Sequence, residues 1–226
     1  MVQQLLTVFA PMLLGAQLIL TLILVKGDIC PGQRGRIHKV LPPIAIMWLA
    51  VASLRIEAMM IVFAIAYFYS QVQTKKTRDQ GPIWVMYLAN GLALAYVGIE
   101  VGSQASLAGG LSVFVQISLL GALLAHLLLT IARTRLQAFH RILPVSGVVS
   151  AMLMSLAILL KANGLDNETL TAVIQPLLVG FALMISSVFV WCWHMLTAKE
   201  INKMQLGIAL AFMLIAATSN QAIFAL

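Results

Sequence analysis

Long apolar runs are the feature that most constrains this chain. A transmembrane α-helix needs about 20 mainly apolar residues to cross a hydrocarbon core about 30 Å thick. The clear runs cover residues 5–25, 83–102, 111–132, 142–160, 170–193 and 204–226. Only 9% of the residues are charged, whereas about a quarter are charged in a typical soluble domain. The sequence therefore predicts an all-α integral membrane protein, with one transmembrane domain over residues 1–226.

The basic residues predict how the chain is oriented in the membrane. The net charge is +7, and twelve of the 14 basic residues fall in four short loops between apolar segments. These are Lys26, Arg34, Arg36 and Lys39; Lys75, Lys76 and Arg78; Arg133, Arg135 and Arg141; and Lys199 and Lys203. Positive residues in short loops favour the cytoplasmic side. We therefore expect a protein of a bacterial inner membrane, surrounded by the lipid bilayer, with cytoplasmic basic loops and no nucleic-acid partner.

Residues 41–72 form an apolar stretch that is too long for an ordinary single crossing. Arg55 and Glu57 interrupt it near the middle, so it is either one steeply tilted helix or two short helices that meet at residues 53–57. All four basic loops can be cytoplasmic only if this stretch crosses the membrane twice. The charge pattern therefore favours eight transmembrane helices with both termini outside.

An internal repeat favours the same number of helices. Residues 38–42 (His-Lys-Val-Leu-Pro) match residues 140–144 (His-Arg-Ile-Leu-Pro), and residues 6–9 (Leu-Thr-Val-Phe) resemble residues 111–114 (Leu-Ser-Val-Phe). Further on, Gly91 begins a six-residue segment that resembles the one beginning at Gly207. The matches occur in the same order in both halves. They predict two parallel four-helix repeats, approximately residues 1–104 and 105–226, related by an axis along the membrane normal.

Polar side chains within or beside the apolar segments are the candidate substrate-binding residues, because polar groups in a membrane need a partner or a function. They are Gln17, Arg55, Glu57, Asn90, Glu100, Gln116 and Gln175. Glu100 ends a long apolar run, and Ala216 stands at its position in the second repeat. The structural alternative is that the amides join neighbouring helices by hydrogen bonds and that the charged residues lie at the membrane surface.

The histidines are the candidate metal or haem ligands. His38, His126, His140 and His194 are all expected toward the cytoplasmic side. Imidazoles on different helices can bind haem iron or a metal ion. However, the sequence contains no CxxCH or HExxH motif. We therefore expect no cofactor, with haem b as the alternative.

The function most consistent with this pattern is a small transporter or permease. The sequence has no nucleophile elbow, phosphate loop or protease motif, so we do not expect an enzyme. One alternative is a non-catalytic subunit or scaffold of a larger complex, which would bind protein partners or form a homo-oligomer. A second alternative is a haem- or metal-binding redox subunit that uses the histidines.

Overall fold

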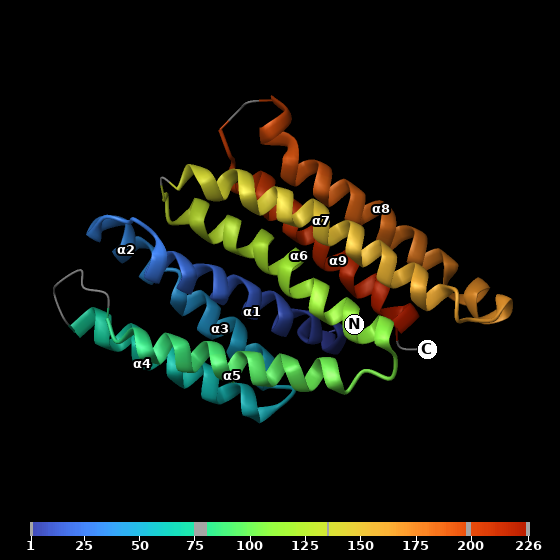
Figure 1. Ribbon diagram of the computed structural model, residues 1–226, viewed down its shortest axis with the longest axis horizontal. Coiled ribbons are helices and arrows are strands. Elements are labelled where there is room, and N and C mark those ends of the chain that lie inside the picture. The colour runs from blue at the N-terminus through green and yellow to red at the C-terminus, as the bar shows by residue number, and fades with distance from the viewer. Residues whose placement is uncertain (1, 75–80, 135, 198–199, 225–226) are drawn as a thin grey trace.

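The computed structural model describes residues 2–74, 81–134, 136–197 and 200–224, and every regular element in these ranges is helical (Figure 1). Six elements are long helices: α1 (Val2–Lys26), α5 (Ile83–Gly102), α6 (Leu107–Ile131), α7 (Gln137–Ala162), α8 (Asn167–Thr197) and α9 (Lys203–Phe224). The shorter elements are α2 (Pro31–His38), α3 (Leu41–Ala52), the 3-10 turn η1 (Ile56–Ala58) and α4 (Met59–Thr74). The six long helices have the length and apolar character needed to cross a membrane. The all-α membrane prediction is confirmed.

The ambiguous stretch forms two short helices instead of one long helix. Arg55 separates α3 from η1 and has an extended backbone, with φ −142° and ψ 116°. Arg55 and Glu57 are both exposed at this break, where their charges remain accessible to water. At 1.5 Å per residue, the 12 residues of α3 and the 16 residues of α4 rise about 18 and 24 Å, which is less than the thickness of a typical hydrocarbon core.

Helices α1 and α6 lie side by side at the centre of the bundle and run in the same direction (Figure 1). They touch where Gly15 faces Gly121. A Cβ atom added to Gly15 would lie 2.9 Å from the Cα atom of Gly121 and would collide with the carbonyl oxygen of Ile117. Only glycine permits so close an approach of two helix backbones.

The remaining helices pack in corresponding ways in the two halves of the chain. In the first half, α1 contacts α3 and α5, and α4 contacts α5. In the second half, α6 contacts α7 and α9, and α8 contacts α9. Across the halves, α1 contacts α9 and α5 contacts α6. The first turns of α1 and α6 therefore meet the last turns of α5 and α9 at one end of the bundle.

Two of the basic loops meet at the opposite end. The guanidinium Nη1 of Arg36, in α2, donates a hydrogen bond to the carbonyl oxygen of Arg133, which follows α6, at 3.1 Å. This contact places two basic loops on one side of the molecule. Five other basic residues used in the orientation argument lie outside the described residues: Lys75, Lys76, Arg78, Arg135 and Lys199.

Candidate functional site

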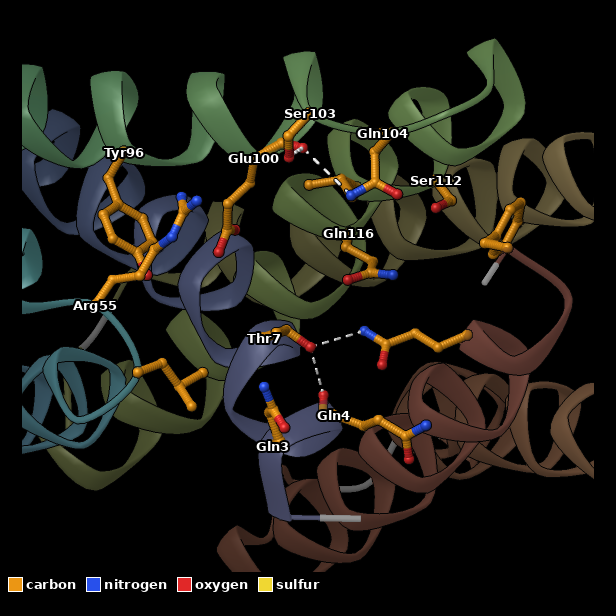
Figure 2. A pocket seen from close by; sticks show the side chains of 14 residues that line it. Gln3, Gln4, Thr7, Arg55, Tyr96, Glu100, Ser103, Gln104, Ser112 and Gln116 are labelled. Atoms are coloured by element: carbon orange, nitrogen blue, oxygen red, sulfur yellow. Dashed lines mark hydrogen bonds between the residues drawn. The ribbon is translucent and has the colours of Figure 1, made fainter. Parts of the chain in front are cut away.

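A cavity of about 430 Å³ opens between the two halves, at the end of the bundle where α1 and α6 begin (Figure 2). Its walls come from the first turns of α1 and α6, the turn after α3, and the last turns of α5 and α9. Gln3, Gln4 and Thr7 line it from α1, and Gln221 lines it from α9. The site therefore exists only when both halves of the chain are folded together.

Most of the residues that line the cavity have polar side chains, although the protein around it is strongly apolar. Glutamines contribute five of the lining side chains, and the hydroxyl groups of Thr7, Tyr96, Ser103 and Ser112 also line it. Part of this wall is fixed by internal hydrogen bonds. The Gln221 amide donates to the Thr7 hydroxyl at 3.2 Å, and the Thr7 hydroxyl donates to the Gln4 carbonyl oxygen at 2.8 Å. The Gln104 amide donates to the Glu100 carbonyl oxygen at 3.3 Å.

Glu100 and Arg55 are the charged side chains that line this cavity. Glu100 is half-buried near the end of α5, and Arg55 is exposed at the turn between α3 and η1. The Arg55 charge acts on the Glu100 carboxyl group through space, yet the two groups form no ion pair in the described structure. In Figure 2, the Arg55 side chain lies beside Tyr96, and the Glu100 carboxyl group points into the cavity. Both charges are thus available to a molecule inside it.

Gln116 is the most informative side chain in the wall. It lies on α6, is only 3% exposed and lines the cavity. Among the described residues, none makes a hydrogen bond to its side-chain amide. Its amide nitrogen and oxygen are not among the buried polar atoms that lack a partner, so they reach the open space of the cavity, where water or a bound molecule can pair with them. This amide therefore has free donors and a free acceptor aimed into the cavity (Figure 2).

Two of the predicted binding residues, Gln17 and Asn90, are partners of each other. The buried Gln17 amide on α1 donates to Asn90 Oδ1 on α5 at 2.8 Å. The indole Nε1 of Trp48 on α3 donates to Gln17 Oε1 at 3.0 Å. These bonds tie α1, α3 and α5 together and correspond to the structural alternative that the sequence offered for the amides. Neither amide lines the cavity.

The other candidates are divided between the cavity and the protein surface. Arg55, Glu100 and Gln116 line the cavity, whereas Glu57 and Gln175 do not. Glu57 is exposed in η1, and Gln175 is exposed on α8. Three of the seven residues named from the sequence therefore line one cavity, and only the structure shows that they lie together.

Several residues that line the cavity were not among the candidates named from the sequence. The repeat carried a signal for two of them, because the matching segments 6–9 and 111–114 place Thr7 and Ser112 at equivalent positions. Both line the cavity, one from each half. The glutamines near the ends of α1, α5 and α9 gave no such signal, since polar residues at helix ends are ordinary.

Three of the four histidines lie together at the opposite end of the second half. His126 Nε2 and His140 Nδ1 are 3.0 Å apart, and the indole Nε1 of Trp191 donates to His126 Nδ1 at 2.8 Å. The His194 ring packs edge-on against His126, with centroids 5.7 Å apart. Both ring nitrogens of His126 are therefore used in hydrogen bonds. Within the described ranges, no group of three or more His, Cys, Asp or Glu residues has a metal-binding arrangement.

His38 stands apart from this cluster. It ends α2, and its ring packs edge-on against Phe68 of α4, with centroids 5.5 Å apart. Both of its ring nitrogens are buried, and neither has a hydrogen-bond partner in the described part of the chain. Burial lowers the pKa of His38 to about 4, with a smaller contribution in the same direction from the nearby Arg34 charge. The ring is therefore neutral at pH 7.

The six long apolar helices define an integral membrane protein. Residues 1–219 match a family described as an integral membrane domain, and the chain belongs to this family. An uncharacterized protein of Haemophilus influenzae is 35% identical over 164 residues, which cover 67% of this chain and 61% of the relative's length. No solved structure matches the chain. Neither description names a substrate, so the cavity is the basis for a functional argument.

Proposed function

We propose that this protein is a membrane transporter of small polar solutes and that it binds its substrate in the cavity between the two halves. The observation that carries this proposal is the Gln116 amide, which opens into the cavity and has no hydrogen-bond partner among the described residues. Polar groups within a membrane protein are expensive and commonly belong to a substrate or ion pathway. A volume of about 430 Å³ falls in the range of small-molecule pockets, which suits a solute and not a macromolecule.

The proposed architecture is two parallel four-helix repeats with eight crossings. Helices α1, α3, α4 and α5 would form the first repeat, and α6 to α9 the second. The matching contacts within the halves and the parallel packing of α1 and α6 support this arrangement. The short helices α3 and α4 would then require local thinning of the bilayer. Transporters with parallel repeats bind substrate near the interface of the repeats, which is where the cavity lies.

The orientation follows from the same proposal. The cavity lies at the end that holds the first turn of α1 and the last turn of α9, opposite the Arg36–Arg133 contact. With the basic loops in the cytoplasm of a bacterial inner membrane, the cavity faces outward and both termini are outside. Toward the cytoplasm, the path is closed by the Gly15–Gly121 contact and by the buried bonds of Gln17 and His126. The structure would then represent an outward-facing state.

A substrate-independent uptake assay tests this function. Proteoliposomes containing the purified protein are incubated with the water-soluble extract of bacteria grown on uniformly ¹³C-labelled carbon, and the trapped labelled solutes are identified by mass spectrometry. We expect one solute, or a few related solutes, to accumulate with the wild-type protein. Gln116→Ala and Glu100→Gln should abolish this accumulation.

The matched control is Gln175→Ala, because Gln175 is an exposed amide outside the cavity. This variant should accumulate the same solutes as the wild-type protein. If the amount of every trapped labelled solute equals that in protein-free liposomes, the protein is not a transporter of small polar solutes. If Gln116→Ala retains full uptake, the cavity is not the substrate site.

A further inference from the structure

The cavity presents one positive and one negative side chain that do not neutralise each other directly. Arg55 comes from the turn after α3, and Glu100 comes from the last turns of α5. The Arg55 charge acts on the Glu100 carboxyl group through space, but no ion pair within 4.0 Å joins them in the described structure. The other described side chains that line the cavity are uncharged. The arrangement therefore resembles a site that holds two opposite charges of one ligand apart.

The charge of a bound molecule decides whether Arg55 and Glu100 each gain an oppositely charged partner. A simple anion would pair with Arg55 but would bring its charge close to the Glu100 carboxylate. A simple cation would pair with Glu100 and be repelled by Arg55. Removing a charged group from water without a partner is costly. A molecule that carries both charges can pair with both side chains, so electrostatic complementarity selects it over either singly charged molecule.

We infer that the cavity binds a small zwitterion of the amino-acid or betaine type, with its carboxylate toward Arg55 and its ammonium group toward Glu100. Arg guanidinium groups pair well with carboxylates because two parallel N–H donors match the two oxygens. The Gln116 amide supplies a third contact, from α6 on the far side of Glu100 from Arg55 (Figure 2). This inference rests on the proposed transport function, because it names the substrate class of the same site.

Gln116 adds specificity beyond net charge. Its amide can donate to a carboxylate and can also accept from an ammonium group. Its position on α6, between the parts of the wall that hold Ser112 and Glu100, is visible in Figure 2. Contacts from the α3–η1 turn, α5 and α6 would together fix the orientation of a small ligand. A neutral solute would use Gln116 alone and leave both charges without a partner.

A cysteine-protection assay measures occupancy of the cavity without requiring transport. Ser112→Cys places a nearly isosteric thiol in the wall, and Val113→Cys provides a second position in case the first does not fold. The background carries Cys30→Ser and Cys192→Ser, which removes the two natural cysteines. Methyl methanethiosulfonate, a small uncharged reagent, modifies the remaining thiol.

The test compounds separate charge from size. Alanine is compared with propionate, isopropylammonium and lactamide, which have similar size but different charge. A second set, β-alanine, γ-aminobutyrate and glycine betaine, varies the spacing and form of the charges.

We expect at least one zwitterion to slow the modification, and the singly charged and neutral analogues to have little effect. At ten times its dissociation constant, a protecting zwitterion should slow the reaction about tenfold, because the rate falls by the factor 1 + [L]/Kd. Charge variants then test the assignment. Glu100→Gln should shift the preference to propionate, and Arg55→Gln should shift it to isopropylammonium.

The possible failures are distinguishable. If propionate, isopropylammonium or lactamide protects better than every zwitterion, the substrate class is wrong, while the cavity remains a ligand site. If the thiols react but no compound protects them, the zwitterion inference also fails, and the uptake assay independently decides whether the protein is a transporter. If neither cysteine reacts in a folded variant, no accessible cavity exists, and both the inference and the transport proposal are overturned.

Discussion

The indole Nε1 of Trp191 donates a hydrogen bond to Nδ1 of His126 across 2.8 Å in the interior of the second half. An indole N–H can only donate, so this bond requires His126 to be unprotonated at Nδ1. His126 in its neutral form therefore carries its proton on Nε2 and donates it to His140 Nδ1 at 3.0 Å. The bond fixes both the tautomer and the direction of a hydrogen-bond chain that joins α8, α6 and α7.

We predict that Trp191→Phe destabilises the protein and releases this tautomer. The variant leaves His126 Nδ1 buried without a donor, which should lower the free energy of unfolding by about 1–3 kcal/mol. Unfolding in mixed detergent micelles measures the loss, and ¹⁵N spectra of histidine-labelled protein report the tautomer. Trp193→Phe is the control, because Trp193 is exposed on the same helix. An unchanged His126 spectrum in Trp191→Phe would show that the indole does not set the tautomer.

A second prediction concerns the contact between α1 and α6. Gly15→Ala adds a methyl group where the Gly121 backbone already lies within van der Waals distance, so the two central helices must separate. We expect the melting temperature to fall. Gly91→Ala is the matched control, since a Cβ atom at Gly91 meets nothing within 4 Å. Alanine favours helix by about 1 kcal/mol over glycine in this setting, so the control should melt at the same temperature or higher. Equal melting temperatures for the two variants would contradict the close contact.

The Gln17–Asn90 bond should be visible as an energetic coupling. Gln17→Leu leaves the Asn90 carbonyl oxygen without its donor and the Trp48 indole without its acceptor. Asn90→Leu leaves the Gln17 amide without its acceptor. A double-mutant cycle should therefore give a coupling of about 0.6–2 kcal/mol, the range found for buried polar pairs between membrane helices. The corresponding cycle for Gln17 with Gln175 is the control, because Gln175 is exposed on α8. Equal couplings in the two cycles would mean that the bond contributes nothing specific.

His38 gives a pH dependence that can be checked. Its pKa is lowered from 6.5 to about 4 by burial and by the Arg34 charge. Between these pH values, the unfolded chain binds a proton at this position and the folded chain does not. The contribution of His38 to stability is therefore complete above pH 6.5 and is lost as the pH falls toward 4.

The measurement compares thermal unfolding of the wild-type protein and His38→Gln at several pH values. The other histidines are common to both proteins, so the difference between them isolates His38. We expect the wild-type protein to lose more stability than the variant between pH 6.5 and pH 4. Parallel pH profiles would show that the His38 ring is not buried as a neutral group.

The secondary structure was largely predictable because membrane helices have a strong and simple signal. Runs of about 20 apolar residues must satisfy their backbone groups internally, and helices achieve this. The break within residues 41–72 was also visible, since Arg55 and Glu57 cannot both be buried in lipid at low cost. The short helix α2 was not predicted. Its eight residues carry two arginines and no apolar run, so hydropathy does not distinguish it from a loop.

The candidate site was only partly predictable, because hydropathy identifies polar residues in apolar segments but not their partners. Gln17 and Gln116 look alike in the sequence, yet the first has two hydrogen-bond partners and the second faces the cavity with none. That difference depends on where Trp48 and Asn90 are placed by the packing of other helices. Arg55 and Glu100 meet at one cavity because the α3–η1 turn and the end of α5 lie at the same end of the bundle, a relationship that local sequence does not contain.

The contact of Gly15 with Gly121 has a mechanical consequence. Two helices that touch through backbone atoms have no side chain between them at that point, although α1 and α6 share many other contacts. The cavity lies on one side of the Gly15–Gly121 contact, and the buried hydrogen bonds of Gln17 and His126 lie on the other. A change in crossing angle about this contact would move the two sides in opposite directions, as the two arms of a lever do.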